Sequence, residues 1–279
     1  MIKNILFGVD GSPFGDIARD YAIDLAKRLG ARLEAVHVVD SRMLDFPLVA
    51  PQTGVIAWNP AALNGLQQSL RARGEALLRD TAARGEEAGV PIVTTLEFGH
   101  PSQVFDEIQS RTELVVLGRQ GEHSKSAPDL TGSTMDRFIR HASRPCLVTP
   151  GAFRPVRKIL CGVDGSASAA RALHEAVELA NALGAPLVIL AVAEREGDLP
   201  LAQRNAVEAH SLARGHGCAA ATLTAVGPPA IRILEQAEET GCDLVVLGSH
   251  GHGWIYDRLI GSAAAHVVSR GKSPVLLVR

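Results

Sequence analysis

Short apolar runs alternate with longer segments of helical periodicity along the whole chain. In the second half, the apolar runs fall near residues 158–163, 187–193, 219–226, 243–248 and 274–278. Short runs of this kind, separated by helix-like segments, are typical of βαβ units and a parallel sheet. Ser12 followed by Pro13, and Ser166 in the second half, predict N-caps for the first helix of each half. The pattern therefore predicts an α/β fold with a helix-covered parallel sheet.

The same landmarks occur twice, in the same order. The stretch from Lys3 to Ser12 recurs from Lys158 to Ser166, and its strand-end aspartate lies 28 residues before a valine in both copies. The matched positions are Asp10 with Asp164, Val38 with Val192, Gly99 with Gly227, Gly118 with Gly248 and Pro145 with Pro274. Repeated landmarks at this scale indicate a duplicated structural unit. We predict one domain at residues 1–150 and a second at 157–279, joined by a linker at 151–155.

The last apolar run of each copy is short and follows a proline, Pro145 or Pro274. Proline in this position suits an edge strand. We therefore expect the two final strands to be edges that can pair with each other, which would make the chain an internal pseudo-dimer.

The copies differ mainly in the length of one crossover. Val38 to Gly99 spans 61 positions, whereas Val192 to Gly227 spans 35. We expect the excess to fall largely in residues 40–60, an irregular stretch rich in proline. The helix that follows is predicted to carry an apolar stripe made of Leu63, Leu66, Leu70 and Leu77.

Composition narrows the classes of function. The hydrophobic fraction is 46%, which supports a substantial core, and the net charge of −2 gives no basic surface for nucleic acid. Four cysteines, Cys146, Cys161, Cys218 and Cys242, show no CxxC spacing, which argues for a reducing compartment and against structural zinc. A strand begins almost at the first residue and no apolar run reaches about 20 residues. We expect a cytoplasmic protein with no signal peptide, no membrane partner and no nucleic-acid partner.

A glycine-rich loop in the second copy carries the candidate chemistry. Gly248, Gly251 and Gly261 follow a strand in the spacing G-x2-G-x9-G, and Ser262 then opens a helix. Glycines let backbone N–H groups approach an anion, and a helix N-terminus adds its dipole. In a doubly wound sheet, Asp164 and this loop would flank the topological switch point, where ligands bind. Asp164 would then accept a hydrogen bond from a base while the loop holds phosphates.

These residues together resemble the universal stress protein family in its tandem two-domain form, over nearly the whole chain. The resemblance implies two Rossmann-like, doubly wound, five-stranded parallel domains with strand order 3-2-1-4-5. It also implies a stress-response regulator that binds ATP or AMP, or no nucleotide. Asp164 and the backbone of Val192 would contact adenine, and Gly227 would lie near the ribose. The phosphate-binding positions would be Gly248, His250, Gly251, Gly261, Ser262 and Ala263.

The first copy departs from the motif. Gly118 and Gly121 are followed by ten residues instead of nine before Gly132. The extra residue puts ordinary binding in doubt, although Arg119 and Lys125 could meet a phosphate. The corresponding candidate site is Asp10, Val38, Gly99, Gly118, Gly121, Gly132, Ser133 and Thr134.

Simpler interpretations stand beside these. Strand-end glycines are often only turn residues, and Asp10 and Asp164 are also suited to capping the turns that follow them. His250 and His252 are interpreted as exposed loop residues because no acidic or cysteine partner lies at ligand spacing, so no metal site is expected. Asp257 and Arg258 are interpreted as solvated, with contact to a phosphate or metal as the alternative.

The leading hypothesis is an ATP-binding stress-response regulator, with Mg²⁺ as a candidate companion ion and AMP or ADP as alternative ligands. Ordering of the loop between Gly251 and Gly261 would be read by a protein partner, and a homodimer is expected. No catalytic residue is identified, because the chain has neither a G-x-S-x-G elbow nor a Walker P-loop. The alternatives are a nucleotide-free interaction scaffold and a weak ATP hydrolase or phosphotransferase.

Overall fold

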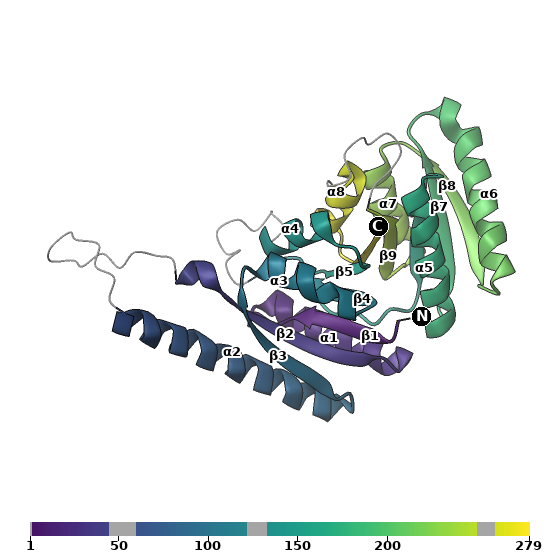
Figure 1. Ribbon diagram of the computed structural model, residues 1–279. Helices are drawn as coiled ribbons and strands as arrows, with labels where there is room; N and C mark the ends of the chain where they lie inside the picture. The colour runs from purple at the N-terminus through teal and green to yellow at the C-terminus, as the bar shows by residue number, and fades with distance from the viewer. Residues whose placement is uncertain (1, 45–59, 122–132, 250–259) are drawn as a thin grey trace, which may run out of the picture.

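The computed structural model describes residues 2–44, 60–121, 133–249 and 260–279. These residues form a single sheet of ten strands flanked by helices (Figure 1). Repeat 1 supplies β1 (Asn4–Gly8), β2 (Arg32–Asp40), β3 (Ile92–Gly99), β4 (Leu114–Gly118) and β5 (Cys146–Thr149). Repeat 2 supplies β6 (Ile159–Val163), β7 (Leu187–Ala193), β8 (Ala220–Val226), β9 (Leu244–Gly248) and β10 (Val275–Val278).

The strand order is β3-β2-β1-β4-β5-β10-β9-β6-β7-β8. Within each repeat the strands are parallel and follow the order 3-2-1-4-5, which confirms the predicted doubly wound, Rossmann-like α/β fold. The five strands of repeat 2 also match the apolar runs of the sequence to within a residue at each end.

The two five-stranded sheets meet at an antiparallel seam between β5 and β10. Cys146, Leu147 and Val148 pair with Leu277, Leu276 and Val275, respectively. The expectation that the two final strands would pair with each other is therefore confirmed. Each strand is an edge of its own repeat, and together they lie at the centre of the complete sheet.

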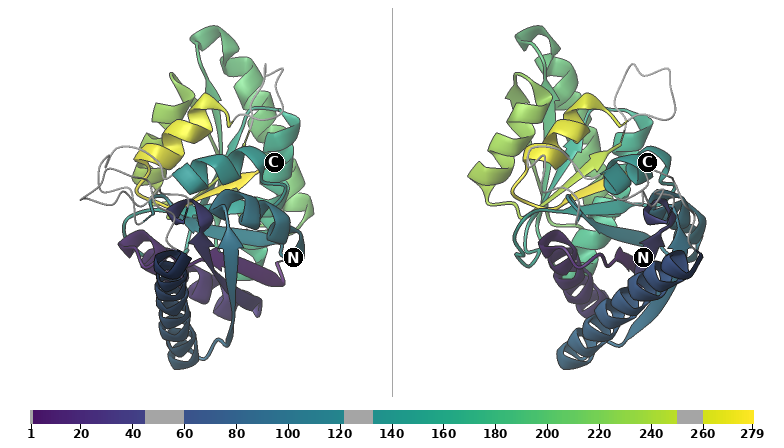
Figure 2. Two further views of the ribbon diagram at one scale, coloured as in Figure 1. Left: turned by 60° about the vertical axis from the view of Figure 1, so that its left-hand side comes forward. Right: turned by 90° about the vertical axis from the view of Figure 1, so that its left-hand side faces the viewer.

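Helices cover both faces of the sheet (Figures 1 and 2). The helices of repeat 1 are α1 (Pro13–Leu29), α2 (Pro60–Ala88), α3 (Pro101–Ile108) and α4 (Ser133–His141). Those of repeat 2 are α5 (Ala167–Leu183), α6 (Leu199–Gly215), α7 (Pro229–Thr240) and α8 (Ser262–Arg270). The described residues also form short 3-10 turns at η1 (Ser41–Met43), η2 (Gln109–Arg111) and η4 (Glu196–Asp198). One buried core lies beneath α1, α2, α5 and α6, and a second lies beneath the other four helices. Both cores run across the seam.

The first helix of each repeat starts and stops as its sequence predicts. The hydroxyl of Ser12 accepts a hydrogen bond from the Gly15 amide, and that of Ser166 accepts one from the Ala169 amide. Both helices end in a glycine with left-handed backbone, at φ 64° for Gly30 and 63° for Gly184. These caps place the helix N-termini next to the ends of β1 and β6, where the candidate ligand crevices lie.

The leucine stripe predicted on α2 is confirmed in part, since Leu63, Leu70 and Leu77 are half-buried. Leu66 is 37% exposed, whereas the residues buried on this helix are Gly74, Leu78, Thr81 and Gly85. A β-carbon at Gly74 would lie 2.5 Å from the His37 ring, so glycine there lets α2 approach the sheet closely. The first half of α2 extends beyond the edge of the sheet (Figure 1), and its leucines are less buried than Leu78 in the second half.

The extra length of the first crossover is divided between its helix and the segment before that helix. Helix α2 has 29 residues and its counterpart α6 has 17, a difference of 12. The total excess is 61 − 35 = 26 positions, so nearly half of it lies in the helix and not in residues 40–60. Residues 45–59 lie outside the described part of the chain.

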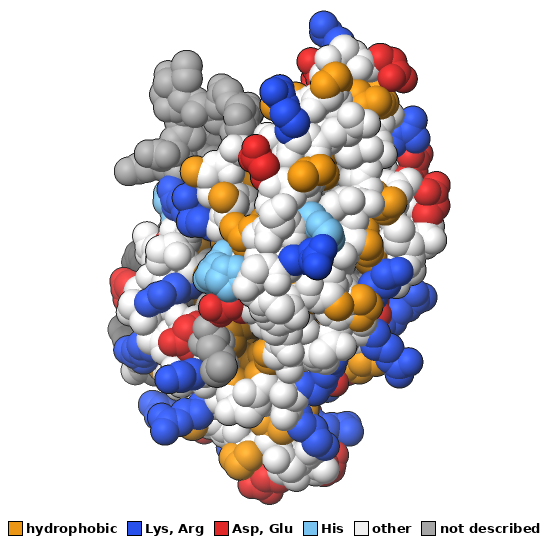
Figure 3. All heavy atoms as spheres, turned by 90° about the vertical axis from the view of Figure 1, so that its right-hand side faces the viewer, with side chains coloured by type: hydrophobic (Ala, Val, Ile, Leu, Met, Phe, Trp, Pro, Cys, Tyr) orange, Lys and Arg blue, Asp and Glu red, His pale blue; other side chains and the backbone are white. Residues whose placement is uncertain are grey.

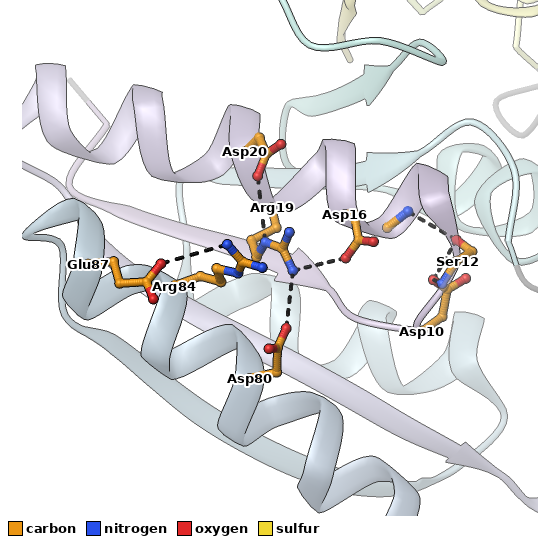
Figure 4. Close-up of polar contacts among 9 residues, drawn as sticks. Asp10, Ser12, Asp16, Arg19, Asp20, Asp80, Arg84 and Glu87 are labelled. Atoms are coloured by element: carbon orange, nitrogen blue, oxygen red, sulfur yellow. Dashed lines mark hydrogen bonds and ion pairs between the residues drawn. The ribbon is translucent and has the colours of Figure 1, made fainter.

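Arg19 and Tyr21 attach α1 to the segments on either side of it. Arg19 of α1 forms ion pairs with Asp16 at 2.9 Å and with Asp80 of α2 at 3.7 Å (Figure 4). On the other side, the Tyr21 hydroxyl accepts a hydrogen bond from the Arg154 amide, and its ring meets Phe153 edge-on with 4.8 Å between centroids. Tyr21 thereby attaches the linker to the first helix of repeat 1.

All four cysteines are unpaired and buried, and burial raises the pKa of Cys146 and Cys161 to about 12. Charges of both signs are interspersed on the face in Figure 3, without a continuous basic area. Among the described residues, no helix is long and apolar enough to span a bilayer.

Candidate functional site

The candidate crevice of repeat 2 lies at the carboxyl ends of β6 and β9. These two strands are parallel neighbours, and β7 lies on the other side of β6. Helix connections therefore leave the sheet in opposite directions between β6 and β9, which makes this the topological switch point. Asp164 directly follows β6, Gly248 ends β9 and Val192 lies near the end of β7. The fold brings these three sequence-predicted residues to one edge of the sheet.

Asp164 is exposed at this edge and begins a tight turn. Its Oδ1 accepts a hydrogen bond of 2.9 Å from the Ser166 amide, and Gly165 between them has φ +83°. The aspartate thus has the turn-forming role that the simpler interpretation assigned to it. That role is compatible with ligand binding because a carboxylate accepts several hydrogen bonds.

Gly248 has a packing requirement of its own. A β-carbon there would lie 2.6 Å from Ser168 Oγ and 2.8 Å from the Ala169 amide nitrogen. The end of β9 is therefore pressed against the first turn of α5, where only glycine fits. Ser168 is buried, and its hydroxyl lies 3.3 Å from that of Ser166. Sequence reasoning missed Ser168, although the Ser-x-Ser pattern at the helix start was visible.

The phosphate end of the candidate site is the N-terminus of α8. Gly261 is its N-cap residue, and its amide donates a 2.8 Å hydrogen bond to the Ser249 carbonyl at the end of β9. Gly261 has no side chain with which to cap the helix, Ser262 is exposed and Ala263 is half-buried. The helix therefore presents its first turn of amides at the switch point, the arrangement that favours an anion.

Gly227 lies on the far side of the same edge. Its amide donates to the Ala193 carbonyl at 2.8 Å, which fixes it next to Val192, and its φ is +134°. A β-carbon would lie 2.8 Å from Arg232 Nε, which itself donates to the Val226 carbonyl. The backbone conformation therefore favours glycine at this position, whereas the flexible Arg232 side chain could move to admit a β-carbon.

In the corresponding crevice of repeat 1 the aspartate, Asp10, is half-buried, whereas Asp164 is exposed. Asp10 Oδ1 accepts hydrogen bonds from the Ser12 amide at 2.9 Å and from its hydroxyl at 2.6 Å (Figure 4). A β-carbon at Gly121 would lie 3.0 Å from Asp10 Oδ2, and one at Gly15 would lie 2.4 Å from Oδ1. Asp10 and Gly121, which the sequence placed in one site, are thus brought together, with the carboxylate facing the loop glycine.

The remaining repeat 1 candidates occupy equivalent places. Gly118 is pressed against the Phe14 backbone, with 2.8 Å from a notional β-carbon to the carbonyl oxygen. Gly99 has φ +149°, and Val38 is half-buried near the end of β2. Ser133 is the first residue of α4, followed by the half-buried Thr134.

Arg119, a candidate for phosphate contact, extends to the other repeat. Its Nη1 donates to the Ser269 and Gly271 carbonyls of repeat 2, each at 3.0 Å. The guanidinium therefore interacts with the end of α8. Several other candidates lie outside the described residues, namely Lys125, Gly132, His250, Gly251, His252, Asp257 and Arg258.

A polar pocket of about 320 Å³ lies between α3 and α4, and sequence reasoning did not find it. It is lined by His100, Ser102, Gln103, Asp106, Arg137 and His141. Arg137 Nη1 lies 3.0 Å from His100 Nε2, and Ser102 Oγ lies 3.1 Å from His100 Nδ1. Arginine only donates, so Nε2 accepts and Nδ1 carries the proton toward Ser102. In this state His100 cannot act as the base for the Ser102 hydroxyl.

The described residues hold one pocket carboxyl with a shifted pKa and no cluster of metal ligands. Burial raises the pKa of Asp106 in the pocket, and the nearby His141 opposes that rise. Across the described ranges, no three His, Cys, Asp or Glu side chains lie together in a way that could hold a metal ion. The described part of the switch-point crevice therefore offers backbone amides, hydroxyls and one exposed carboxylate.

The fold and its two switch-point crevices place the chain in the class of tandem, doubly wound α/β proteins. Comparison with known proteins identifies the family. The model of the universal stress protein family matches residues 1–150 and 155–279, so the chain belongs to that family.

Individual relatives match this chain over nearly all of their length. A universal stress protein of Synechocystis sp. is 29% identical and aligns over 100% of both chains. One from Mycobacterium tuberculosis is 27% identical over 99% of this chain and 94% of its own. A universal stress protein structure from Archaeoglobus fulgidus has a TM-score of 0.76 with 20% identity, and covers 99% of this chain and 98% of its own. That structural likeness supports the fold.

Proposed function

We propose that the protein is a nucleotide-dependent regulator of a stress response that binds ATP at least in repeat 2. The observation that carries this proposal is the meeting of the N-terminus of α8, which has Gly261 as its N-cap residue, with the exposed Asp164 at one switch point. AMP and ADP are alternative ligands, and Mg²⁺ is a candidate companion of the phosphates. Membership in the universal stress protein family agrees with the proposal.

The phosphate half rests on backbone geometry. Buried Gly261 is held against Ser249 by its own amide, so the amides of Ser262 and Ala263 form the first turn behind it. Helix N-terminal amides and the positive end of the dipole attract phosphate oxygens. The exposed Ser262 hydroxyl would add a donor, and a side chain at position 261 would fill the approach.

The base half rests on Asp164 and β7. Asp164 is exposed beyond the end of β6, and Val192 lies on the neighbouring strand. The carboxylate would accept a hydrogen bond from an adenine amino group, and the Val192 backbone would contact the base edge. Gly227, held beside Ala193, would leave room for the ribose.

Repeat 1 is proposed as the weaker site. Its aspartate already contacts Ser12 through both the amide and the hydroxyl, and it faces Gly121 closely. The chain is proposed to act in the cytoplasm and to transmit nucleotide occupancy to a protein partner. Any homodimer would use surfaces other than the β5 and β10 edges, since these pair within the chain.

Calorimetric titration with ATP tests the proposal. Wild-type protein should bind ATP saturably, and Gly261→Glu should remove the repeat 2 transition by filling and charging the phosphate position. Gly215→Glu is a matched control because a β-carbon there meets nothing within 4 Å and the residue ends α6, in a different helix from α8. Binding that survives Gly261→Glu unchanged would contradict the site.

A second measurement separates the regulator from a nucleotide-free scaffold. Protein purified without added ligand is denatured, and the released small molecules are analysed by chromatography. Release of adenine nucleotide at up to two per chain supports the proposal. If no nucleotide is released and no ATP binds in the titration, the scaffold alternative is favoured.

A further inference from the structure

Arg119 lies inside the glycine motif of repeat 1 but makes its contacts in repeat 2. It follows Gly118 at the end of β4, and its amide donates to the Thr149 carbonyl of β5 at 3.2 Å. Its side chain crosses the seam to α8. There Nη1 donates to the Ser269 and Gly271 carbonyls at 3.0 Å each and to the Val268 carbonyl at 3.5 Å.

These three carbonyls form the C-terminal end of α8. The last carbonyls of a helix have no partner within the helix, and the helix dipole makes this end negative. A guanidinium satisfies the carbonyls and complements the dipole at the same time. The Arg119 side chain is half-buried, so water screens this interaction less than it would at an exposed position.

Helix α8 depends on such attachments because it is short. Nine residues form about two and a half turns, a length that is marginal without tertiary contacts. Its N-terminal end is attached to Ser249 through the Gly261 amide, and its C-terminal end is attached to Arg119. The two attachments therefore set the position of the helix along its own axis.

The reciprocal contact in repeat 1 is weaker and has a different origin. Arg279 Nη1 donates to the Ala142 carbonyl just after α4 at 3.5 Å. Arg279 follows β10, whereas Arg119 belongs to the loop between Gly118 and Gly121. Within the described part of the chain, the Arg119 contact links the candidate loop of one repeat with the candidate phosphate-binding helix of the other.

We propose that Arg119 is a positioning residue for the nucleotide site of repeat 2, holding α8 from the glycine loop of repeat 1 so that loop and helix respond to a ligand together. This inference rests on the proposed function. It means that the repeat 2 site is not self-contained, and that the diverged loop of repeat 1 serves its neighbour. Coupling of this kind must be reciprocal, so ATP at α8 should also protect the loop residues near Arg119.

The test combines ATP titration with amide hydrogen exchange on the full chain. Arg119→Ala should lower the ATP affinity of repeat 2 by about fivefold or more, the lower end of the usual coupling between sites. The repeat 2 affinity is read from the titration transition that Gly261→Glu removes. In ligand-free protein it should speed exchange in α8 while leaving the central strands unchanged. Arg119→Lys, which keeps the charge but loses the planar fork, should give an intermediate effect.

The control is Arg111→Ala, which removes an exposed arginine of the same repeat at the end of η2. It should change neither affinity nor exchange in α8. Unchanged affinity and unchanged α8 exchange in Arg119→Ala would overturn the inference, as would faster exchange spread evenly over the whole sheet. If wild-type protein binds no ATP, the proposed function fails and so does the ligand half of this inference. The exchange result on ligand-free protein then decides separately whether Arg119 holds α8.

Discussion

Leu147 of β5 is paired directly with Leu276 of β10, and both side chains are only 2% exposed. This pair lies at the centre of the seam that converts two five-stranded sheets into one. Leu147 and Leu276 both belong to the core beneath α1, α2, α5 and α6, which runs across both repeats. The two repeats therefore share a core as well as a sheet.

Leu276→Ala should destabilise both repeats together. Truncating a fully buried leucine costs about 2–5 kcal/mol of unfolding free energy, from lost burial and the cavity that remains. Because the core crosses the seam, urea unfolding followed by circular dichroism should stay a single transition at lower urea concentration. Leu66→Ala, at a 37% exposed position on α2, is the control and should change stability by less than about 0.5 kcal/mol. Two separated transitions would show that the repeats unfold independently.

Gly248→Ala should destabilise the end of β9 without removing any interaction. The added β-carbon would overlap Ser168 Oγ at 2.6 Å and the Ala169 amide at 2.8 Å, and overpacking of this kind costs about 1–3 kcal/mol. Combining it with Ser168→Ala should recover only part of the loss, because the backbone atoms remain in contact. Thermal unfolding measures both variants. Gly215→Ala, in open space, is the control, and full recovery in the double variant would contradict the backbone clash.

Tyr21→Phe should loosen the linker. The substitution removes the hydroxyl, which accepts from the Arg154 amide at 3.1 Å and donates to the Ala152 carbonyl at 3.4 Å, and each lost hydrogen bond of this kind costs about 1 kcal/mol. Limited proteolysis should then cut near residues 151–157 faster than in wild-type protein. Phe153→Leu keeps the hydroxyl and removes the edge-on ring contact, so comparing the two variants separates the contributions. Equal proteolysis rates in Tyr21→Phe and wild-type protein would contradict this role.

The buried thiols predict a loss of stability at alkaline pH. In the folded chain Cys146 and Cys161 keep their protons up to a pKa of about 12, whereas the ordinary thiol pKa is 9.0. Above pH 9 the unfolded chain therefore binds fewer protons, and the unfolding free energy falls by up to about 1.4 kcal/mol per pH unit for each thiol. The contribution is complete below pH 9 and is lost as the pH rises toward 12.

Urea unfolding between pH 8 and pH 10.5 measures this slope. The double variant Cys146→Ala, Cys161→Ala should be less stable at pH 8, but its stability should fall less steeply with pH. The difference between the two slopes isolates the thiols from lysine and tyrosine, which titrate in the same range in both proteins. Parallel slopes would show that these thiols do not govern the alkaline response.

Much of the candidate site followed from residue types in order along the chain. Asp164, Gly248 and Gly261 are separated by many residues, yet each follows a strand or opens a helix. Parallel strands direct all their carboxyl ends to one edge, so a correct strand order was enough to bring them together. Ser168 and the pocket at His100 were missed because their importance depends on which helix turns meet, and that is not periodic in sequence.

The sequence by itself determined the duplication, the helix caps and the pairing potential of the final strands, whereas the strand order within each repeat came from the family resemblance. The features that the sequence determined are encoded locally, through hydrophobic spacing, capping residues and prolines. Only the tertiary structure decided that α2 approaches the sheet closely at Gly74 and Gly85. It also decided that Arg119 serves the opposite repeat. Both outcomes depend on distances between segments far apart in the chain, where shape and the unpaired carbonyls of a neighbouring helix select the partner.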